Sequence, residues 1–239
     1  MSHRDFYKFQ AEARDVHTLN DVRRIASEKA YIYDRIVLPW LPTDKRSRIS
    51  EIACGHGSFL CWLAERGYTS LTGIDSSQEQ IEFARQLGIE VQQMDANQWL
   101  AGQPPGSQHI IAGIDLIEHL TKDEVMELLK AAYRALAGGG RLILRYPNGD
   151  SPLVGMNLFN DITHVWTYTP NCLNSLAIMH GFSCVHFVDE SSTAIRDQRW
   201  LKVPICKIST SLLRFLFRAA TREKVDYWSP HIWACLEKK

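Results

Sequence analysis

Three aspartates stand at or just after the ends of short apolar segments of this sequence. They are Asp75, Asp95 and Asp115. A carboxylate in such a position accepts hydrogen bonds from the hydroxyl groups of a ligand, such as the two hydroxyls of a ribose. Parallel strands end at one edge of a sheet, and ligands bind beyond that edge. We therefore expect the three acids to line one binding site.

A glycine-rich turn follows the first apolar segment. It reads Ala53-Cys54-Gly55-His56-Gly57-Ser58. Glycine lets the backbone approach a ligand closely, and the N-terminus of the helix that follows favours an anionic group. A dinucleotide fingerprint needs a third glycine, where this sequence has Leu60 or Ser58, so a nicotinamide cofactor is disfavoured.

A second cluster of polar residues begins at Asp115 and continues with Glu118 and His119. Residues three or four apart share one face of a helical turn, so we expect these three side chains to lie together. Two carboxylates and an imidazole suit a hard or borderline divalent cation.

A histidine, His164, stands in a long polar and aromatic loop, within Asp161-Ile162-Thr163-His164. Three alternative roles are open to His164. The first is a metal ligand together with Glu118 and His119, the second is a general base paired with Asp161, and the third is a structural residue that orders the loop. A hydroxyl acceptor is a poor nucleophile while protonated, and a base or a metal supplies the missing activation.

The elements that would position these residues alternate along the chain. Strands are predicted at 49–54, 70–75, 89–93, 109–114 and 140–146, and helices at 57–66, 78–87 and 122–136. This alternation is typical of a doubly wound α/β fold with a mostly parallel sheet. A helix at 171–180 and strands at 182–188 and 230–236 come next. Residues 1–48 form a helical lead-in, whose helix is expected to end near Pro39 and Pro42, and 49–239 form the main domain.

The motif at the first strand and the acids after the second and third strands together resemble class I S-adenosylmethionine-dependent methyltransferases. The motif runs from Glu51 to Gly57, and Gly73-Ile74-Asp75 and then Asp95 come after it. The resemblance implies a Rossmann-like seven-stranded sheet whose last strand, 230–236, lies antiparallel beside the fifth. It implies that S-adenosylmethionine is bound by a set of residues at the strand ends: Glu51, Gly55, Gly57, Asp75, Ser76, Asp95, Ala96 and Asp115.

Within that set, the resemblance implies distinct contacts. Gly55 and Gly57 would line the methionine end, Asp75 would hold the ribose, and Asp95 with Ala96 would hold the adenine.

Two narrower resemblances concern the acceptor. The run from Asp115 to His119 is similar to the metal-holding E-x-x-E-H of ubiquinone-biosynthesis O-methyltransferases and small-RNA 2′-O-methyltransferases. In the RNA enzymes a downstream histidine completes the site, which implies a divalent metal at Glu118, His119 and His164. The D-x-T-H loop resembles methyltransferases associated with bacterial polysaccharide and O-antigen genes.

These resemblances imply O-methylation of a sugar hydroxyl on a bacterial polysaccharide, glycolipid or activated sugar. Two alternatives stay open, a quinone or phenolic O-methyltransferase and a non-catalytic methyltransferase-fold subunit that supports a partner.

Charge is unevenly distributed along this chain of zero formal net charge. Residues 49–195 carry a net −9 and residues 196–224 a net +6. Overall neutrality argues against a nucleic-acid partner bound through bulk positive charge. The chain starts without an apolar leader, and no run of 18 apolar residues occurs, so the expected location is the cytoplasm.

The segment 205–222, within a basic insertion at 196–229, predicts an amphipathic helix with an apolar and a basic face. Three interpretations stay open for it: a helix packed on the core, a basic element that meets an anionic glycan or the inner membrane, and a homodimer contact.

Overall fold

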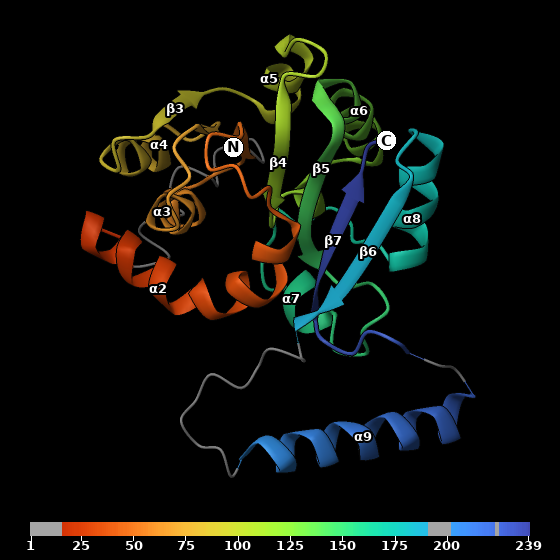
Figure 1. Cartoon of the computed structure of the whole chain (residues 1–239). Helices are drawn as coiled ribbons and strands as arrows, with labels where there is room; N and C mark the ends of the chain where they lie inside the picture. Colours follow the sequence, from red (N-terminus) through yellow and green to blue (C-terminus); the bar gives the residue numbers. More distant parts are fainter. Residues whose placement is uncertain (1–15, 191–201, 223–224) are drawn as a thin grey trace.

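The computed structural model describes residues 16–190, 202–222 and 225–239. Within them, seven strands form one sheet in the order β3-β2-β1-β4-β5-β7-β6, with helices on both faces (Figure 1). β7 pairs antiparallel with β5 and with β6, whereas the pairs among β1 to β5 are parallel. The strands are β1 (Ile49–Ile52), β2 (Leu71–Asp75), β3 (Glu90–Gln93), β4 (Gln108–Ile114), β5 (Leu136–Pro147), β6 (Cys184–Asp189) and β7 (His231–Glu237).

The helices alternate with the strands along most of the chain. They are α2 (Leu19–Ile36), α3 (Ser58–Glu65), α4 (Gln78–Arg85), α5 (Ala96–Gly102), α6 (Lys122–Ala135), α7 (Gly155–Leu158), α8 (Pro170–Met179) and α9 (Lys202–Thr221), with short 3-10 turns at Leu38–Trp40 and Ile117–His119. The doubly wound fold and the place of the last strand beside the fifth are confirmed. The two short helices α5 and α7 were not predicted, because neither has enough turns to show a helical period.

β5 begins earlier than the strand expected at 140–146. Three glycines, 138–140, are typical of a turn in the sequence, yet here they extend the strand back to Leu136, which pairs with Gln108 of β4. A register shift between Gln108 and Ile110 accommodates the extra residues.

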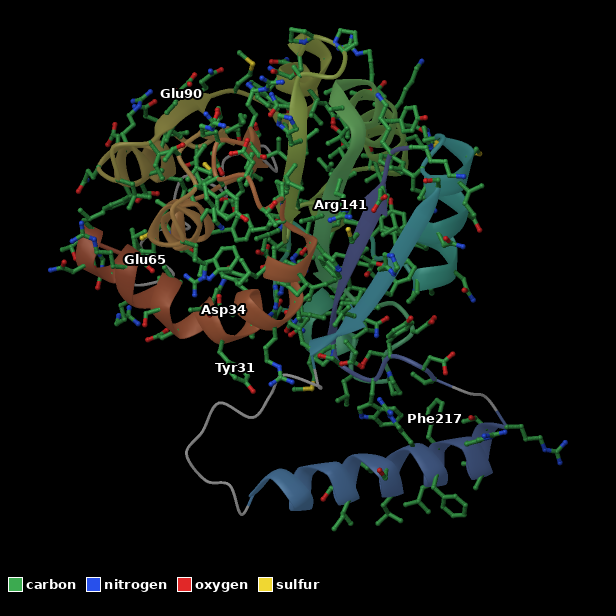
Figure 2. All side chains as sticks on the ribbon, in the orientation of Figure 1. Tyr31, Asp34, Glu65, Glu90, Arg141 and Phe217 are labelled. Atoms are coloured by element: carbon green, nitrogen blue, oxygen red, sulfur yellow. The ribbon has the colours of Figure 1, made fainter. Side chains whose placement is uncertain are left out.

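The helical lead-in packs against α3. Tyr33 of α2 lies 5.2 Å from the rings of both Phe59 and Trp62 of α3, and Asp34 accepts a 2.5 Å hydrogen bond from Nε of Arg66. Figure 2 labels Asp34 on α2, which passes below α3 in this view. Residues 1–15 of the predicted lead-in lie outside the described residues.

The basic helix expected at 205–222 is present as α9, between β6 and β7. It lies apart from the sheet, beyond the point where β6 ends (Figure 1). Residues 196–201, 223 and 224 of the predicted insertion lie outside the described residues. Among the residues that the structure describes, no helix has the length and apolar character needed to cross a membrane.

Candidate functional site

A cavity of about 530 Å³ opens at the carboxyl ends of β1, β2 and β4. Most of the residues predicted to hold a cofactor line it, as parallel strand ends require. These are Glu51, Gly55, Asp75, Ser76, Asp95, Ala96 and Asp115.

Asp75 ties two of the cavity's loops together. Its Oδ2 accepts a 2.8 Å hydrogen bond from the amide of Gly55, and its Oδ1 accepts another of 2.8 Å from the amide of Ser77. Gly55 has φ +52°, a left-handed conformation that favours glycine. The carboxylate therefore holds the turn after β1 against the turn after β2.

Gly57 is not among the residues that line the cavity. It has φ +84°, and a Cβ at this position would lie 2.8 Å from Cδ1 of Leu87 and 3.1 Å from Cβ of Ala84. The close approach of the turn to this neighbouring segment therefore requires a glycine here.

Asp95 has a structural role beside its place at the cavity. Its Oδ1 accepts hydrogen bonds from the amides of Asn97 and Gln98, at 3.0 and 3.1 Å, and so caps the N-terminus of α5.

Glu51, at the floor of the cavity, is 3% exposed, and its Oε2 has no hydrogen-bond partner. Burial raises the pKa of this carboxyl well above its usual range, and the nearby charge of Lys29 works against that rise. A buried acceptor without a donor at a cavity wall suits the amino group of a ligand.

Asp115 does not share a face with Glu118 and His119, contrary to the expectation from spacing. Its φ of +54° is left-handed, so no regular helical turn runs from it. Its carboxylate instead forms an ion pair with Nη1 of Arg145, whose Nε donates to Glu190 over 2.6 Å. Burial works to raise the pKa of Asp115, but the Arg145 guanidinium outweighs it and lowers the pKa to about 2.

Glu118, His119 and His164 come together beside the cavity. One ligand atom from each residue lies within 4.8 Å of the others. The rings of His119 and His164 meet at a centroid distance of 4.6 Å. Glu118 is 2% exposed, and its Oε2 has no hydrogen-bond partner. The cluster of three side chains therefore includes a buried carboxylate oxygen without a donor.

Hydrogen bonds set the tautomers of the two histidines. Thr163 Oγ1 donates its one proton to Asp161 Oδ1 over 2.6 Å, so it accepts from Nδ1 of His119 at 2.8 Å. Nδ1 of His164 donates to the carbonyl of Leu158 over 3.0 Å. Nδ1 is therefore the donor nitrogen in both rings.

Asp161 acts on a different histidine from the one expected. The sequence suggested an Asp161–His164 pair. The carboxylate of Asp161 instead reaches His119 through Thr163, while its main-chain carbonyl accepts a 3.2 Å hydrogen bond from the amide of His164. Burial and the neighbouring His164 lower the pKa of His119 to about 4, so this ring is neutral at physiological pH.

The loop that carries His164 is held by the main chain of Glu118. Its carbonyl accepts from the amides of Val165, at 2.7 Å, and Trp166, at 3.3 Å. The ammonium of Lys122, in the first turn of α6, lies 3.9 Å from the centre of the Trp166 ring, a cation–π contact.

Comparison with known proteins agrees with this geometry. Residues 49–140 match a family model described as a methyltransferase domain. The Bacillus subtilis protein YqeM, a candidate methyltransferase by its name, is 28% identical in an alignment 153 residues long that covers 58% of this chain and 60% of YqeM. Residues 49–140 therefore form a methyltransferase domain, and the sheet has the Rossmann-like fold of class I methyltransferases.

Solved structures share the fold of this methyltransferase domain. An S-adenosylmethionine-dependent methyltransferase from Archaeoglobus fulgidus superposes with a TM-score of 0.68 at 22% identity, covering 89% of this chain and 94% of that one. Phosphoethanolamine N-methyltransferase 2 from Haemonchus contortus, solved with S-adenosylmethionine, reaches 0.65 at 15% identity, covering 100% of this chain and 60% of that one. At such identities the likeness concerns the fold alone.

Several residues of the methyltransferase domain's site were missed by sequence reasoning. Lys29 and Tyr33 reach the cavity from α2, which looked like a lead-in, and Thr121 and Glu124 reach it from the start of α6. Thr121 and Glu124 form the capping box of α6, a pattern that the sequence does show. Arg145 also had a signal, because a lone arginine inside the apolar run of β5 needs a partner.

Proposed function

We propose that the protein is an O-methyltransferase in which Glu118, His119 and His164 hold a divalent cation next to the cofactor cavity. The observation that carries this proposal is the convergence of their three ligand atoms within 4.8 Å. As the acceptor we propose a sugar hydroxyl of a glycan, glycolipid or activated sugar.

The cavity residues fit S-adenosylmethionine. The carboxylate of Glu51 offers a buried acceptor without a donor, and Gly55 brings bare backbone to the same wall. Asp75 stands at the end of β2 with its carboxylate already aligned by two backbone amides. When bound, the cofactor would supply a methyl group on a sulfonium, and in-line attack of the acceptor oxygen on that methyl group would release S-adenosylhomocysteine.

The Glu118–His119–His164 group fits a divalent cation. It offers one carboxylate oxygen and one ring nitrogen from each histidine, and a cation would satisfy the buried Oε2 of Glu118. When bound, the cation lowers the pKa of an acceptor hydroxyl and orients it.

The chain's own residues prepare this site. Thr163 and Asp161 hold His119 in one tautomer, and the carbonyl of Leu158 does the same for His164. Such partners orient a ligating imidazole and raise its basicity. The lone pairs are then in place before an acceptor arrives.

One observation favours a second candidate, a quinone or phenolic acceptor. Val165 and Trp166, the residues after His164, are 48% and 46% exposed, and Val165 also lines the cavity. An apolar rim at this place suits an acceptor with an apolar body. The third alternative is a non-catalytic subunit. It differs from both enzymes because it would bind the cofactor without transferring a methyl group.

Calorimetry with S-adenosylhomocysteine is the first test, and wild type that fails to bind it would refute the proposal. The second test measures transfer of labelled methyl from S-adenosylmethionine to glycan, glycolipid and phenolic acceptors. We expect His164→Ala to lose most turnover while S-adenosylhomocysteine binding is kept, and His180→Ala at the end of α8 to behave as wild type. Activity that survives exhaustive chelation contradicts the metal assignment and leaves His164 as a base.

A further inference from the structure

The helix α9 meets the rest of the described molecule through one side. The ring of Phe217 lies 5.9 Å from that of Trp228, and Arg214 lies 4.0 Å from Asp189 at the end of β6. Figure 2 shows Phe217 pointing from α9 toward the body of the protein.

The opposite side of α9 is apolar and exposed. Ile208, Leu212, Phe215 and Leu216 share a face by their spacing of three and four, and they are 67%, 55%, 67% and 51% exposed. At about 100° per residue, this face lies roughly opposite Phe217 and Arg214. The interpretation of α9 as a helix packed on the core is therefore wrong for these side chains.

The helix is also strongly basic. Residues 202–222 contain five basic and no acidic residues. The described ones among them, Arg214, Arg218 and Arg222, are exposed. An apolar face flanked by arginines, with no acidic residue in the helix, is the pattern of helices that lie in the plane of an anionic membrane surface.

A second exposed apolar segment lies at the same edge of the sheet. Residues 153–166, which include α7 and lead to His164, expose large side chains: Leu153, Met156, Phe159, Ile162, Val165 and Trp166. With Ile208, Leu212, Leu213, Phe215 and Leu216 of α9, they make up eleven of the fourteen exposed large hydrophobic side chains among the described residues.

Trp228 contacts α9 and the chain just before residue 153. Ser151 donates a 2.8 Å hydrogen bond to the carbonyl of Trp228, and the ring of Trp228 contacts Phe217 of α9. β6 runs parallel to β5 and therefore ends at the edge at which the cofactor cavity opens, and Asp189 at this end lies 4.0 Å from Arg214 of α9. We call these two segments, 153–166 and 208–222, the apolar edge.

We propose that the apolar edge docks the protein on the surface of an anionic lipid bilayer. The charge of α9 decides between a bilayer and a second copy of the chain. Pairing two such helices would bring their arginines together, whereas anionic headgroups neutralise them while the apolar face enters the acyl boundary. Docking in this orientation turns the mouth of the site beside Val165 toward the lipid, where a lipid-borne acceptor resides.

The test is sedimentation of the full chain with vesicles of phosphatidylcholine and of phosphatidylcholine mixed with phosphatidylglycerol. We expect binding to the anionic vesicles and a strong decrease in high salt, because screening weakens the attraction of the arginines. The double substitution Leu212→Glu with Phe215→Glu should weaken binding by about tenfold or more, since it removes the apolar face.

A matched control is Ile178→Glu with Met179→Glu, a pair on α8 that is 61% and 67% exposed and outside the apolar edge. It should bind as wild type. If the α9 double variant fails to fold, Arg218→Ser with Arg222→Ser tests the charge alone and should reduce binding to the anionic vesicles.

Three outcomes overturn the proposal. The first is that the wild type binds neither kind of vesicle. The second is that the α8 and α9 double variants lose vesicle binding equally. The third is that the wild type is a dimer in sedimentation equilibrium, the α9 double variant is not, and neither protein binds vesicles. Vesicle binding is measured without cofactor or acceptor, so it is independent of the proposed methyl transfer.

Discussion

The carbonyl oxygen of Glu118 lies 2.7 Å from the amide nitrogen of Val165. This hydrogen bond joins the turn after β4 to the loop after β5, so the main chain itself holds His164 beside Glu118 and His119. The geometry of the three side chains therefore depends on neighbours that carry no ligand atom, and the first prediction tests one of them.

Thr163→Val should weaken binding of Zn²⁺ and Mn²⁺ by about 10- to 100-fold, because His119 loses the acceptor that fixes its tautomer. Thr163→Ser keeps the hydroxyl and should bind as wild type. Calorimetry with each metal alone measures this, and equal affinities for the valine and serine variants would show that Thr163 has no orienting role.

Asp75→Asn should lower the affinity for S-adenosylhomocysteine by about 10- to 100-fold. The change removes a charge that two backbone amides align, and a hydrogen bond to a charged group contributes about 1.5–3 kcal/mol. Asp44→Asn, at an exposed acid away from the cavity, is the control and should change nothing. An Asp75 variant that binds within twofold of wild type would contradict the assignment.

Gly57→Ala should destabilise the fold more than Gly67→Ala. Both glycines have φ +84°, so both substitutions carry the same backbone strain of about 1 kcal/mol. Only at Gly57 would the new Cβ crowd Leu87 and Ala84, since nothing lies within 4 Å at Gly67. We expect an additional loss of about 1–3 kcal/mol in the free energy of unfolding, measured by urea denaturation. Equal losses would show that the turn can relax.

Arg145→Met should cost about 3–5 kcal/mol of unfolding free energy, because it leaves Asp115 and Glu190 without their buried partner. Arg141→Met on the same strand is the comparison. Its ion pair with Glu237 is about one-third exposed, so we expect a smaller loss.

The Arg145 effect should also depend on pH in a defined direction. Arg145 lowers the pKa of Asp115, to about 2, and that of Glu190, so this stabilisation is complete above the unfolded pKa near 4 and is lost as the pH falls toward 2. The difference in unfolding free energy between wild type and Arg145→Met should therefore become smaller as the pH falls from about 4 to 2. A gap that stays constant would show that the loss comes from packing alone.

His231 should make the protein less stable in mild acid. Burial, and next to it the charge of Arg145, lower its pKa to about 4. The unfolded chain takes up this proton near pH 6.5 and the folded protein does not, so the unfolding free energy falls as the pH drops from about 6.5 to 4. The loss is at most about 3 kcal/mol.

Chemical denaturation across this pH range measures the effect. His231→Gln removes the titrating group and should show a smaller fall than wild type. Equal slopes for the two proteins would mean that His231 titrates near its ordinary value.

Much of the fold was predictable because its signals are local and repeated. Short apolar runs alternate with helical segments in the order that a doubly wound sheet requires, and this alternation gave all seven strands of the described chain. The extension of β5 through three glycines was not predictable, because distant partners hold that backbone: Leu136 pairs with Gln108 of β4, and Gly139 and Gly140 exchange main-chain hydrogen bonds with Lys238.

The residues that line the cavity were predictable for a topological reason, while their partners were not. Strand ends of a parallel sheet must meet at one edge, so the positions of Asp75 and Asp95 in the sequence place them at one cavity. The ion pair between Asp115 and Arg145 depends on a left-handed backbone conformation at Asp115, which spacing along a helix cannot anticipate.

By itself, the sequence determined the doubly wound fold class, the edge of the sheet at which the cavity opens, and the carboxylate and imidazole side chains that suit a cation. Only the tertiary structure decided which atoms meet. Thr163 holds His119, the carbonyl of Glu118 holds the loop of His164, and Phe217 turns the apolar face of α9 outward. The physical reason is the distance along the chain over which each effect acts. Periodicity and turn chemistry act over a few residues, whereas these contacts join segments that are distant in the chain and come close only after folding.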